Sequence, residues 1–372
     1  MKKRLFLIVI ATLAFSGAVP LGIAPRLDKA RVKAYAEAKM ASYGVPGLQI
    51  CVRDHRGMEI LSLSLGYADL ETRRTINRST RLKIGSNTKS FTAMAILILA
   101  ERGQIGLNEH IDRYLDISPP HYGKVTIRQL MNMNSGLRGY INDDDDDRII
   151  DRILTHPAKQ IPPHDLIQRA LTLTNQLGTT DDGKFHYTNT NYILLGMLIE
   201  KVSKVSYADF IYRELLKPLG LHETYMPVDS HYGYNVGKGY HIDKAANTSK
   251  DYSALDLSYV WSAGAMISTA SDLSRWIGMI GTDAVIRGKG SIDVYRGLPI
   301  SRTIQYTSGL IQEPEYFWHN GTVLGYHGEM RYLKGSGTSI AVLANCTLAG
   351  FPMDPIREII DEIARQLTVE MS

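Results

Sequence analysis

Hydrophobic positions in the N-terminal quarter of the chain follow first a helical and then a strand-like period. Leu27 to Tyr43 repeats apolar residues at the spacing of one helix face and stops at Gly44. Gly47 to Arg53 and Met58 to Gly66 then roughly alternate apolar and polar residues on either side of a short polar turn. This pattern predicts one helix followed by a β-hairpin.

The middle of the chain is dominated by helical periodicity and long polar connections. It begins with Ile84 to Gly103, whose second half is apolar almost all round, as is typical of a buried helix. Between Pro227 and Val260, Gly, Tyr, Asn and Ser accumulate without a sustained period, which indicates a long loop region with or without short strands. Shorter helices are predicted at Thr126–Met133, Ile149–Leu154, His164–Leu173, Tyr192–Val202 and Tyr207–Leu216.

Strand-like patterns return in the last part of the chain. Ala263 to Thr269 reads as a strand-like segment that leads into a helix over Ala270 to Ile280. The last quarter predicts strands at Gln305–Ile311, Gly325–Leu333 and Thr338–Asn345, and an amphipathic helix at Pro355–Leu367. The fold class expected from this order is α+β: an antiparallel sheet formed from both chain ends and flanked by helices, with an inserted, mostly helical domain.

The expected domain boundaries follow the change of pattern. Residues 19–85 plus 262–372 form the predicted sheet domain, and residues 86–261 form the helical domain, with a cleft at the interface. Residues 1–18 have a basic start, an apolar run and small residues, which predicts a signal peptide and export to the periplasm or the outside of the cell. An uncleaved N-terminal anchor or a buried helix is the alternative. No other stretch reaches the ~18 apolar residues of a membrane span.

Composition narrows the function classes only modestly. The 372 residues are 44% hydrophobic and 22% charged, as in ordinary globular proteins, and the net charge of +4 without a recurring basic cluster disfavours nucleic-acid binding. Cys51 and Cys346 either form a disulfide or are two buried free thiols. Because no zinc-type spacing occurs, neither a metal nor another cofactor is expected. The run Asp143 to Asp147 is a solvated loop, a site rim that attracts cationic substrate groups, or a weak calcium site.

Candidate chemistry begins at the start of the Ile84 to Gly103 helix. Ser86 and Lys89 are three residues apart in the first turn and therefore project from the same side. A serine hydroxyl becomes a nucleophile only when a base takes its proton, and a lysine is that base only when its pKa is lowered. An N-cap serine beside a solvated lysine is the alternative interpretation.

A tyrosine followed two residues later by an asparagine would supply a proton relay and an amide donor. The chain has two such pairs, Tyr140 with Asn142 and Tyr187 with Asn189. Tyr140 precedes the five carboxylates, which would oppose a phenolate, whereas Tyr187 comes directly before a predicted buried helix. We therefore expect Tyr187 and Asn189 to be the functional pair.

A strand beside the substrate is expected to carry a cation or proton donor followed by a glycine. His319-Asn320-Gly321 is the histidine-x-glycine sequence next to the strand-rich last quarter. His327 is an alternative functional histidine, although a purely structural role in a strand is the simpler interpretation. The same sequence pattern falls in predicted turns or loops at His55, His121 and His231.

Three short segments of the chain resemble, in the same order, the three motifs of the serine β-lactamase and penicillin-binding-protein superfamily. They are Ser86-Asn87-Thr88-Lys89, Tyr187-Thr188-Asn189 and His319-Asn320-Gly321. The likeness is to its branch of class C β-lactamases, D-alanyl-D-alanine carboxypeptidases and related esterases. It extends over the sequences HYTNTNYILLG, KPLGLHETYM, WSAGAMISTASDLSRW and HNGTVLGYHG, and covers the chain from about Val45 to Leu348. The implied fold is the β-lactamase/transpeptidase-like one.

The resemblance implies an acyl-enzyme mechanism. Ser86 would attack a carbonyl, Lys89 and Tyr187 would share the proton transfers as a coupled pair, and the backbone N–H groups of Ser86 and Thr322 would form the oxyanion hole. The implied catalytic residues are thus Ser86, Lys89 and Tyr187, and the implied substrate-binding residues are Asn189, His319, Gly321 and Thr322.

Two positions depart from the family pattern. His319 stands where many relatives have lysine, and because histidine is mostly neutral near pH 7 this weakens the β-lactamase interpretation. Met133 stands where a histidine is common. The expected function is a D-alanyl-D-alanine carboxypeptidase-type serine hydrolase that acts on peptidoglycan peptides or another small acyl substrate, with β-lactams as possible ligands. An esterase, a β-lactamase, and a non-catalytic β-lactam sensor or envelope scaffold are the alternatives.

Overall fold

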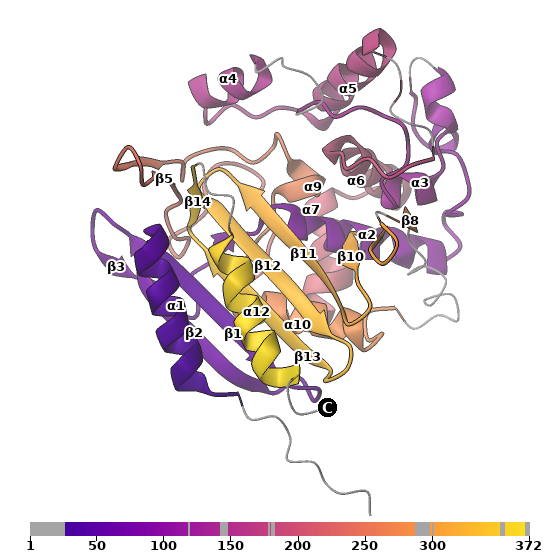
Figure 1. Ribbon diagram of the computed structural model, residues 1–372. Helices are drawn as coiled ribbons and strands as arrows, with labels where there is room; N and C mark the ends of the chain where they lie inside the picture. Colours follow the sequence, from indigo (N-terminus) through magenta and orange to yellow (C-terminus); the bar gives the residue numbers. More distant parts are fainter. Residues whose placement is uncertain are drawn as a thin grey trace, which may run out of the picture.

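The computed structural model describes residues 27–117, 120–141, 148–177, 179, 183–286, 298–299, 301–349 and 354–368 (Figure 1). The predicted signal peptide, residues 1–18, and the carboxylate run Asp143 to Asp147 lie outside these residues. Within these ranges no helix is both long and apolar enough to cross a bilayer.

A nine-stranded sheet built from both ends of the chain is the centre of the fold. Its strand order is β3-β2-β1-β13-β12-β11-β10-β9-β8, and every neighbouring pair is antiparallel. The two chain ends meet where Ile50 of β1 lies opposite Val342 of β13. The sheet strands are β1 (Gly47–Arg53), β2 (Glu59–Asp69), β3 (Arg74–Thr75), β8 (Leu298–Pro299), β9 (Gln305–Thr307), β10 (Leu310–Gln312), β11 (Tyr316–Val323), β12 (Tyr326–Leu333) and β13 (Thr338–Ala344).

Helices cover both faces of this sheet. The terminal helices α1 (Lys29–Tyr43) and α12 (Pro355–Thr368) pack together on one face, where Figure 1 shows them side by side, and α10 (Ala270–Gly281) lies on the other. Each residue of β1 and β13 is accordingly buried. Both strands are buried along their whole length because both faces are covered, and the polar Gln49 and Arg53 of β1 are buried with hydrogen-bond partners. The predicted α+β class and the origin of the sheet from both chain ends are confirmed.

The helical part is organised around α2 (Thr88–Glu101), in which every residue from Thr88 to Leu99 is buried. It contacts α6 (Asn189–Ser203), α7 (Tyr207–Ile211) and α9 (Trp261–Gly264). The other helices of this part are α3 (Ile127–Met131), α4 (Arg148–Thr155), α5 (Pro163–Leu177) and α8 (Lys217–Leu219), with one-turn segments η1 (Gly85–Asn87), η2 (Ile111–Arg113), η3 (Pro120–Lys124) and η4 (Tyr212–Leu216).

The predicted loop region from Pro227 to Val260 contains short strands, β5 (Tyr240–Asp243) and β6 (Thr248–Asp251), which join β14 (Cys346–Leu348) in a second sheet. Two other local predictions needed correction. The segment Ala263–Thr269 is mostly not a strand, because α9 occupies its start and only β7 (Ile267–Ser268) is extended, paired with β4 (Leu82–Lys83). Strand β11 was absent from the predicted strands, since its burial does not alternate over Tyr316 to Trp318.

Candidate active site

Ser86 lies in a single turn between strand β4 and helix α2. Gly85 adopts a positive φ of 52°, which a residue with a side chain rarely adopts. A Cβ atom at Gly85 would also lie 2.6 Å from the backbone nitrogen of Thr322. The glycine thus lets the serine turn lie directly against strand β11.

Lys89 is fully buried, and its amine is surrounded by three oxygen atoms. Nζ lies 2.9 Å from Ser86 Oγ, 2.8 Å from Asn189 Oδ1 and 2.8 Å from the carbonyl oxygen of Ala263. Burial lowers the pKa of Lys89 well below its ordinary value. In the neutral amine two N–H bonds go to the two carbonyl-type oxygens, which can only accept. The lone pair of Nζ is then left for the hydroxyl of Ser86.

Tyr187 closes the other side of the serine. Its hydroxyl hydrogen-bonds Ser86, and its ring centroid lies 4.9 Å from Lys89 Nζ. The residue is 40% exposed because the ring borders solvent. Burial of the phenol raises the pKa of Tyr187, and the hydrogen bond to Ser86 offsets this only in part. The phenol therefore holds its proton at neutral pH and can donate it to a neighbouring atom.

His319 is buried on β11 among aromatic rings. Its Nδ1–H donates to the carbonyl oxygen of Asn320, so Nε2 accepts a hydrogen bond from the hydroxyl of Tyr306, 3.3 Å away. Its ring centroid is 6.2 Å from that of Tyr187. Burial is the main cause that lowers the pKa of His319 to about 3, and Lys89 acts in the same direction when its amine is protonated. His319 is accordingly a neutral group at physiological pH.

Gly321 and Thr322 bring the backbone of β11 against the serine turn. A Cβ at Gly321 would lie 2.0 Å from the carbonyl oxygen of Ile84 and 2.7 Å from the backbone nitrogen of Ser86. Gly85 approaches Thr322 comparably closely. The backbone nitrogens of Ser86 and Thr322 therefore both lie at the contact between η1 and β11, which we call the seam. In an oxyanion hole two neighbouring N–H groups donate to one oxygen atom, so this proximity agrees with the role expected for Ser86 and Thr322.

The other candidates from the sequence lie elsewhere. Tyr140 is 1% exposed and donates its hydroxyl to the carbonyl oxygen of Tyr259 at 2.7 Å, while Asn142 lies outside the described residues. His55 is exposed in the turn between β1 and β2, His231 is exposed in a loop, and His121 lies in η3.

The family model for beta-lactamases matches residues 32–364. The chain belongs to the beta-lactamase family. Members of this superfamily are serine hydrolases, including amidases, penicillin-binding proteins and β-lactamases.

Proteins and solved structures from several organisms are similar to this beta-lactamase family member. Protein flp of Staphylococcus aureus is 27% identical over 239 residues, which are 63% of this chain and only 45% of the relative. Among solved structures, the octameric penicillin-binding protein homologue from Pyrococcus abyssi has a TM-score of 0.77 at 27% identity, covering 92% of this chain and 78% of the other. The D-stereospecific amidohydrolase from Streptomyces sp. has a TM-score of 0.76 at 25% identity, with coverages of 90% and 98%.

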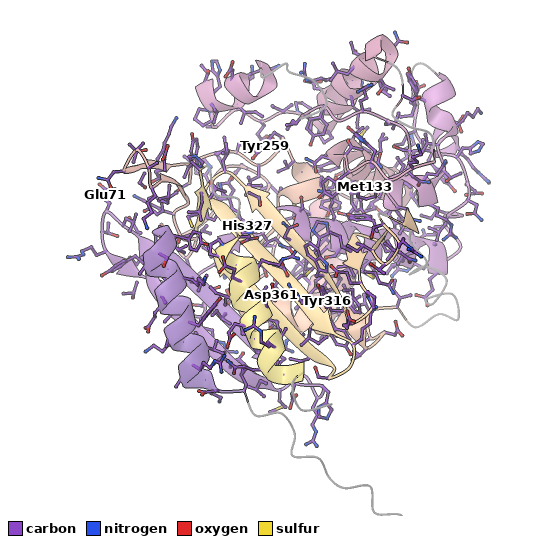
Figure 2. All side chains as sticks on the ribbon, viewed as in Figure 1. Glu71, Met133, Tyr259, Tyr316, His327 and Asp361 are labelled. Atoms are coloured by element: carbon purple, nitrogen blue, oxygen red, sulfur yellow. The ribbon has the colours of Figure 1, made fainter. Side chains whose placement is uncertain are left out.

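Met133 departs from the common family pattern but still anchors the second motif. It has a φ of 60°, and its carbonyl oxygen accepts a hydrogen bond from His186 N at 2.7 Å. Its sulfur lies 3.5 Å from the backbone nitrogen of Thr188 and 3.7 Å from Nδ2 of Asn191. Figure 2 shows this residue in the helical part of the family fold. A thioether thus accepts the two N–H groups, although it is a weak acceptor.

Sequence reasoning missed several partners of the site. The carbonyl oxygen of Ala263 is a backbone atom and leaves no side-chain signal, and Asp354 stands alone in a loop before α12. The hydrogen bond between Tyr306 on β9 and His319 on β11 reaches across the intervening strand β10, and no local sequence pattern indicates it. Cys51 and Cys346 are both buried free thiols.

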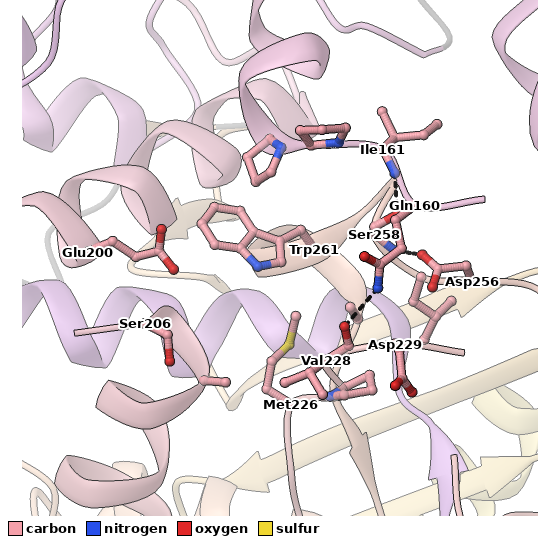
Figure 3. A pocket seen from close by; sticks show the side chains of 16 residues that line it. Gln160, Ile161, Glu200, Ser206, Met226, Val228, Asp229, Asp256, Ser258 and Trp261 are labelled. Carbon is pink, nitrogen blue, oxygen red and sulfur yellow. Dashed lines mark hydrogen bonds between the residues drawn. The ribbon is translucent and has the colours of Figure 1, made fainter. Parts of the chain in front are cut away.

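A cavity of about 360 Å³ lies beside α9 and away from this site (Figure 3). Trp261 lies between Glu200 on one side and Asp229 and Asp256 on the other. None of the candidate catalytic side chains lines it. The cavity is therefore separate from the Ser86 seam.

Proposed function

We propose that this chain is a serine hydrolase that works through an acyl-enzyme on Ser86. The observation that carries the proposal is the buried amine of Lys89, 2.9 Å from the hydroxyl of Ser86. As Oγ attacks a carbonyl carbon, its proton passes to Nζ, and the N–H groups of Ser86 and Thr322 hold the oxyanion. Loss of one such donor typically costs about 3 kcal/mol of transition-state stabilisation.

The roles of Tyr187 and Asn189 complete this mechanism. The phenol of Tyr187 passes a proton to the leaving group as the carbonyl carbon–leaving group bond breaks, and it is reprotonated from Lys89. Water then attacks the acyl-enzyme with the same pair as base. Asn189 turns its Oδ1 to Lys89, so its amide NH₂ is available to a substrate carbonyl.

The proposed substrate is a peptide ending in D-alanyl-D-alanine, as in peptidoglycan. Two solved relatives support it, a penicillin-binding protein homologue and a D-stereospecific amidohydrolase. Export by the signal at residues 1–18 would bring the enzyme to this substrate. In this proposal residues 19–85 plus 262–372 form the sheet domain, residues 86–261 form the helical domain, and substrate enters between them.

An amidase or esterase on uncharged acyl substrates is the second candidate. The observation in its favour is that His319, which occupies the position of the family lysine, is neutral and buried. A substrate carboxylate would therefore lack the cation that lysine supplies, and a β-lactamase activity is disfavoured for the same reason.

Covalent labelling tests the proposal. Incubation with a penicillin, followed by intact-protein mass spectrometry, should give an adduct that is absent in Ser86→Ala, together with release of D-alanine from an acyl-D-alanyl-D-alanine peptide. Ser271→Ala, a serine outside the site, is the matched control and should keep both signals. An adduct without any turnover of peptides, esters or cephalosporins would instead indicate a β-lactam sensor. No adduct and no turnover would refute the enzyme.

A further inference from the structure

The cavity beside α9 is bordered by three loop segments from different parts of the chain, residues 160–163, 226–229 and 256–261. Hydrogen bonds join these segments to one another (Figure 3). The backbone N–H of Ile161 donates to Ser258 Oγ at 2.8 Å, and the side-chain amide of Gln160 donates to the carbonyl oxygen of Val228 at 2.7 Å. Because bonds within the protein hold its walls together, the cavity is formed without a ligand.

Apolar side chains form most of the wall, and the volume suits a small molecule. They include Ile161, Met226, Leu257 and the indole of Trp261. The volume of about 360 Å³ lies within the roughly 300–1,000 Å³ that is usual for small-molecule sites. The indole packs tightly against α6, since a Cβ at Gly196 would lie 2.8 Å from its Cζ3 atom. Such a wall offers a contact surface to the apolar body of a ligand.

The charged side chains at the cavity are all acidic. Glu200, Asp229 and Asp256 line it, and the described lining residues include no lysine, arginine or histidine. Glu200 accepts the backbone N–H of Tyr207 at 2.8 Å, and the half-exposed Asp229 lies 3.5 Å from the ring of His231. This negative cavity occurs in a chain whose net charge is +4. Its electrostatic complement is a cation.

Asp256 is the buried member of this group, and one of its oxygen atoms has no partner. The residue is 4% exposed, and its Oδ1 accepts the backbone N–H of Ser258 at 2.8 Å. Within the described ranges, Oδ2 has neither a hydrogen bond nor an ion pair. Lys83 acts on this carboxylate only from a distance, because its amine donates to the carbonyl oxygens of Ser253 and Leu255. Since a buried carboxylate oxygen needs a donor, Oδ2 marks the place for an N–H group of a ligand.

The arrangement of the acidic groups does not suit a metal ion. The part of the chain that the structure describes contains no group of three or more His, Cys, Asp or Glu side chains that could hold one. Calcium takes about six to eight oxygen ligands, whereas here the acidic side chains lie on either side of the indole of Trp261 (Figure 3). An organic ammonium ion, by contrast, can bind a single carboxylate and the face of an aromatic ring together.

We propose that this cavity binds a small primary amine with an apolar body. The ammonium group donates to Oδ2 of Asp256 and lies against the indole of Trp261, while the apolar body packs against Ile161 and Met226. A quaternary ammonium ion has no N–H group and would leave Oδ2 without a donor, so the primary amine binds more tightly. The proposal does not depend on the chemistry proposed for Ser86, since none of the candidate catalytic side chains lines the cavity.

Titration of the protein with n-hexylamine, 1-hexanol and n-hexyltrimethylammonium tests the proposal. The three probes share one alkyl chain and differ in charge and in N–H donors. Calorimetry should give a single site for hexylamine, with a Kd at least about tenfold below that of either other probe, as expected for one hydrogen bond to a charged group. Hexylamine that binds no more tightly than hexanol or the quaternary ion, or that does not bind, would overturn the proposal.

Asp256→Asn removes the charge but keeps the bond within the loop. The amide oxygen of asparagine can accept the backbone N–H of Ser258 as Oδ1 does, whereas the NH₂ group can only donate. Hexylamine should therefore bind at least about tenfold more weakly, and the Kd of 1-hexanol should stay within about twofold of the wild type. Asp116→Asn, at an exposed aspartate outside the cavity, is the matched control and should keep both affinities.

Val228→Lys is a second variant that leaves the core untouched, because Val228 is 78% exposed. This residue also lines the cavity, so a lysine here adds a positive charge beside the acidic side chains. The affinity for hexylamine should fall about two- to fivefold, in the range of an exposed charge pair, while that for 1-hexanol stays the same. Wild-type affinity for hexylamine in both Val228→Lys and Asp256→Asn would contradict the proposed site.

The indole N–H signals in nitrogen–proton NMR spectra locate the bound amine. The chain has three tryptophans, and the indole N–H groups of Trp276 and Trp318 donate to Ser90 and Glu313, none of which lines the cavity. Hexylamine should shift the signal of Trp261, identified by its loss in Trp261→Phe, and leave the other two in place. Binding of hexylamine without a shift of the Trp261 signal would show that the amine binds elsewhere and that the proposal is wrong.

Discussion

Lys89 illustrates how burial changes the chemistry of a single residue. An ordinary lysine is charged at neutral pH and cannot accept a proton, but burial lowers the pKa of Lys89 and shifts it toward the amine. The pKa of the Tyr187 phenol shifts in the opposite direction, because burial raises it. A lowered pKa at Lys89 and a raised pKa at Tyr187 favour Lys89 as the base and Tyr187 as the proton donor. The sequence left this choice open.

Substitution of the two candidate tyrosines separates the reacting phenol from a structural one. Tyr187→Phe should lower kcat by about 10²- to 10⁴-fold, because no proton reaches the leaving group. Tyr140→Phe should keep kcat within about twofold while it lowers the free energy of unfolding by ~1 kcal/mol, since the carbonyl oxygen of Tyr259 loses its donor. Steady-state kinetics and urea unfolding measure the two effects. A larger rate loss in Tyr140→Phe would contradict the assignment.

At the scale of elements, the site depends on strand β11 lying against the one-turn segment η1. No side chain fits between Gly321 and the backbone of Ile84 and Ser86. Periodicity missed β11 because its first residues are half-buried on both faces, whereas the hairpin of β1 and β2 was predicted because its polar and apolar residues alternate. A strand in a mixed environment has no clear period of two.

Gly321→Ala tests the seam between these elements. Its Cβ would overlap the carbonyl oxygen of Ile84, so β11 must move away from Ser86, and kcat/KM should fall at least about 10²-fold, as expected for a displaced oxyanion donor. Overpacking should also destabilise the fold by ~1–3 kcal/mol. Gly57→Ala, in an open turn with a φ of 75°, should cost ~1 kcal/mol and leave kcat/KM unchanged. Equal activity of the two variants would argue against the seam.

At the scale of the whole molecule, His319 lies where the sheet meets the helical part. Strand β11 brings it into contact with Tyr306 and close to Tyr187, which comes from the segment before α6. Because the buried ring has a pKa of about 3 and the unfolded ring one of about 6.5, the unfolded state takes up the proton first as the pH falls. Stability from this residue is complete above about pH 6.5 and is lost progressively toward pH 3.

The pH dependence of unfolding checks this linkage. The free energy of unfolding of the wild type should fall by up to about 1.4 kcal/mol per pH unit between about pH 6.5 and pH 3 on account of His319. His319→Gln should lose this part of the slope, whatever its stability at neutral pH, whereas His55→Gln, in an exposed turn, should keep it. Chemical denaturation at several pH values gives the slopes. An unchanged slope in His319→Gln would show that the ring is not buried in its neutral form.

The sequence by itself determined the local relationships of this protein. The three-residue spacing of Ser86 and Lys89, the first hairpin, the terminal helices and the order of the motifs are readable because neighbours on a helix or strand are set by a short period. Only the tertiary structure decided that Lys89 is buried against the carbonyl of Ala263, that His319 is neutral, and that Asp354 reaches Thr322 through His327. The physical reason is that burial and charge state depend on contacts between different elements of the fold, which no local pattern records.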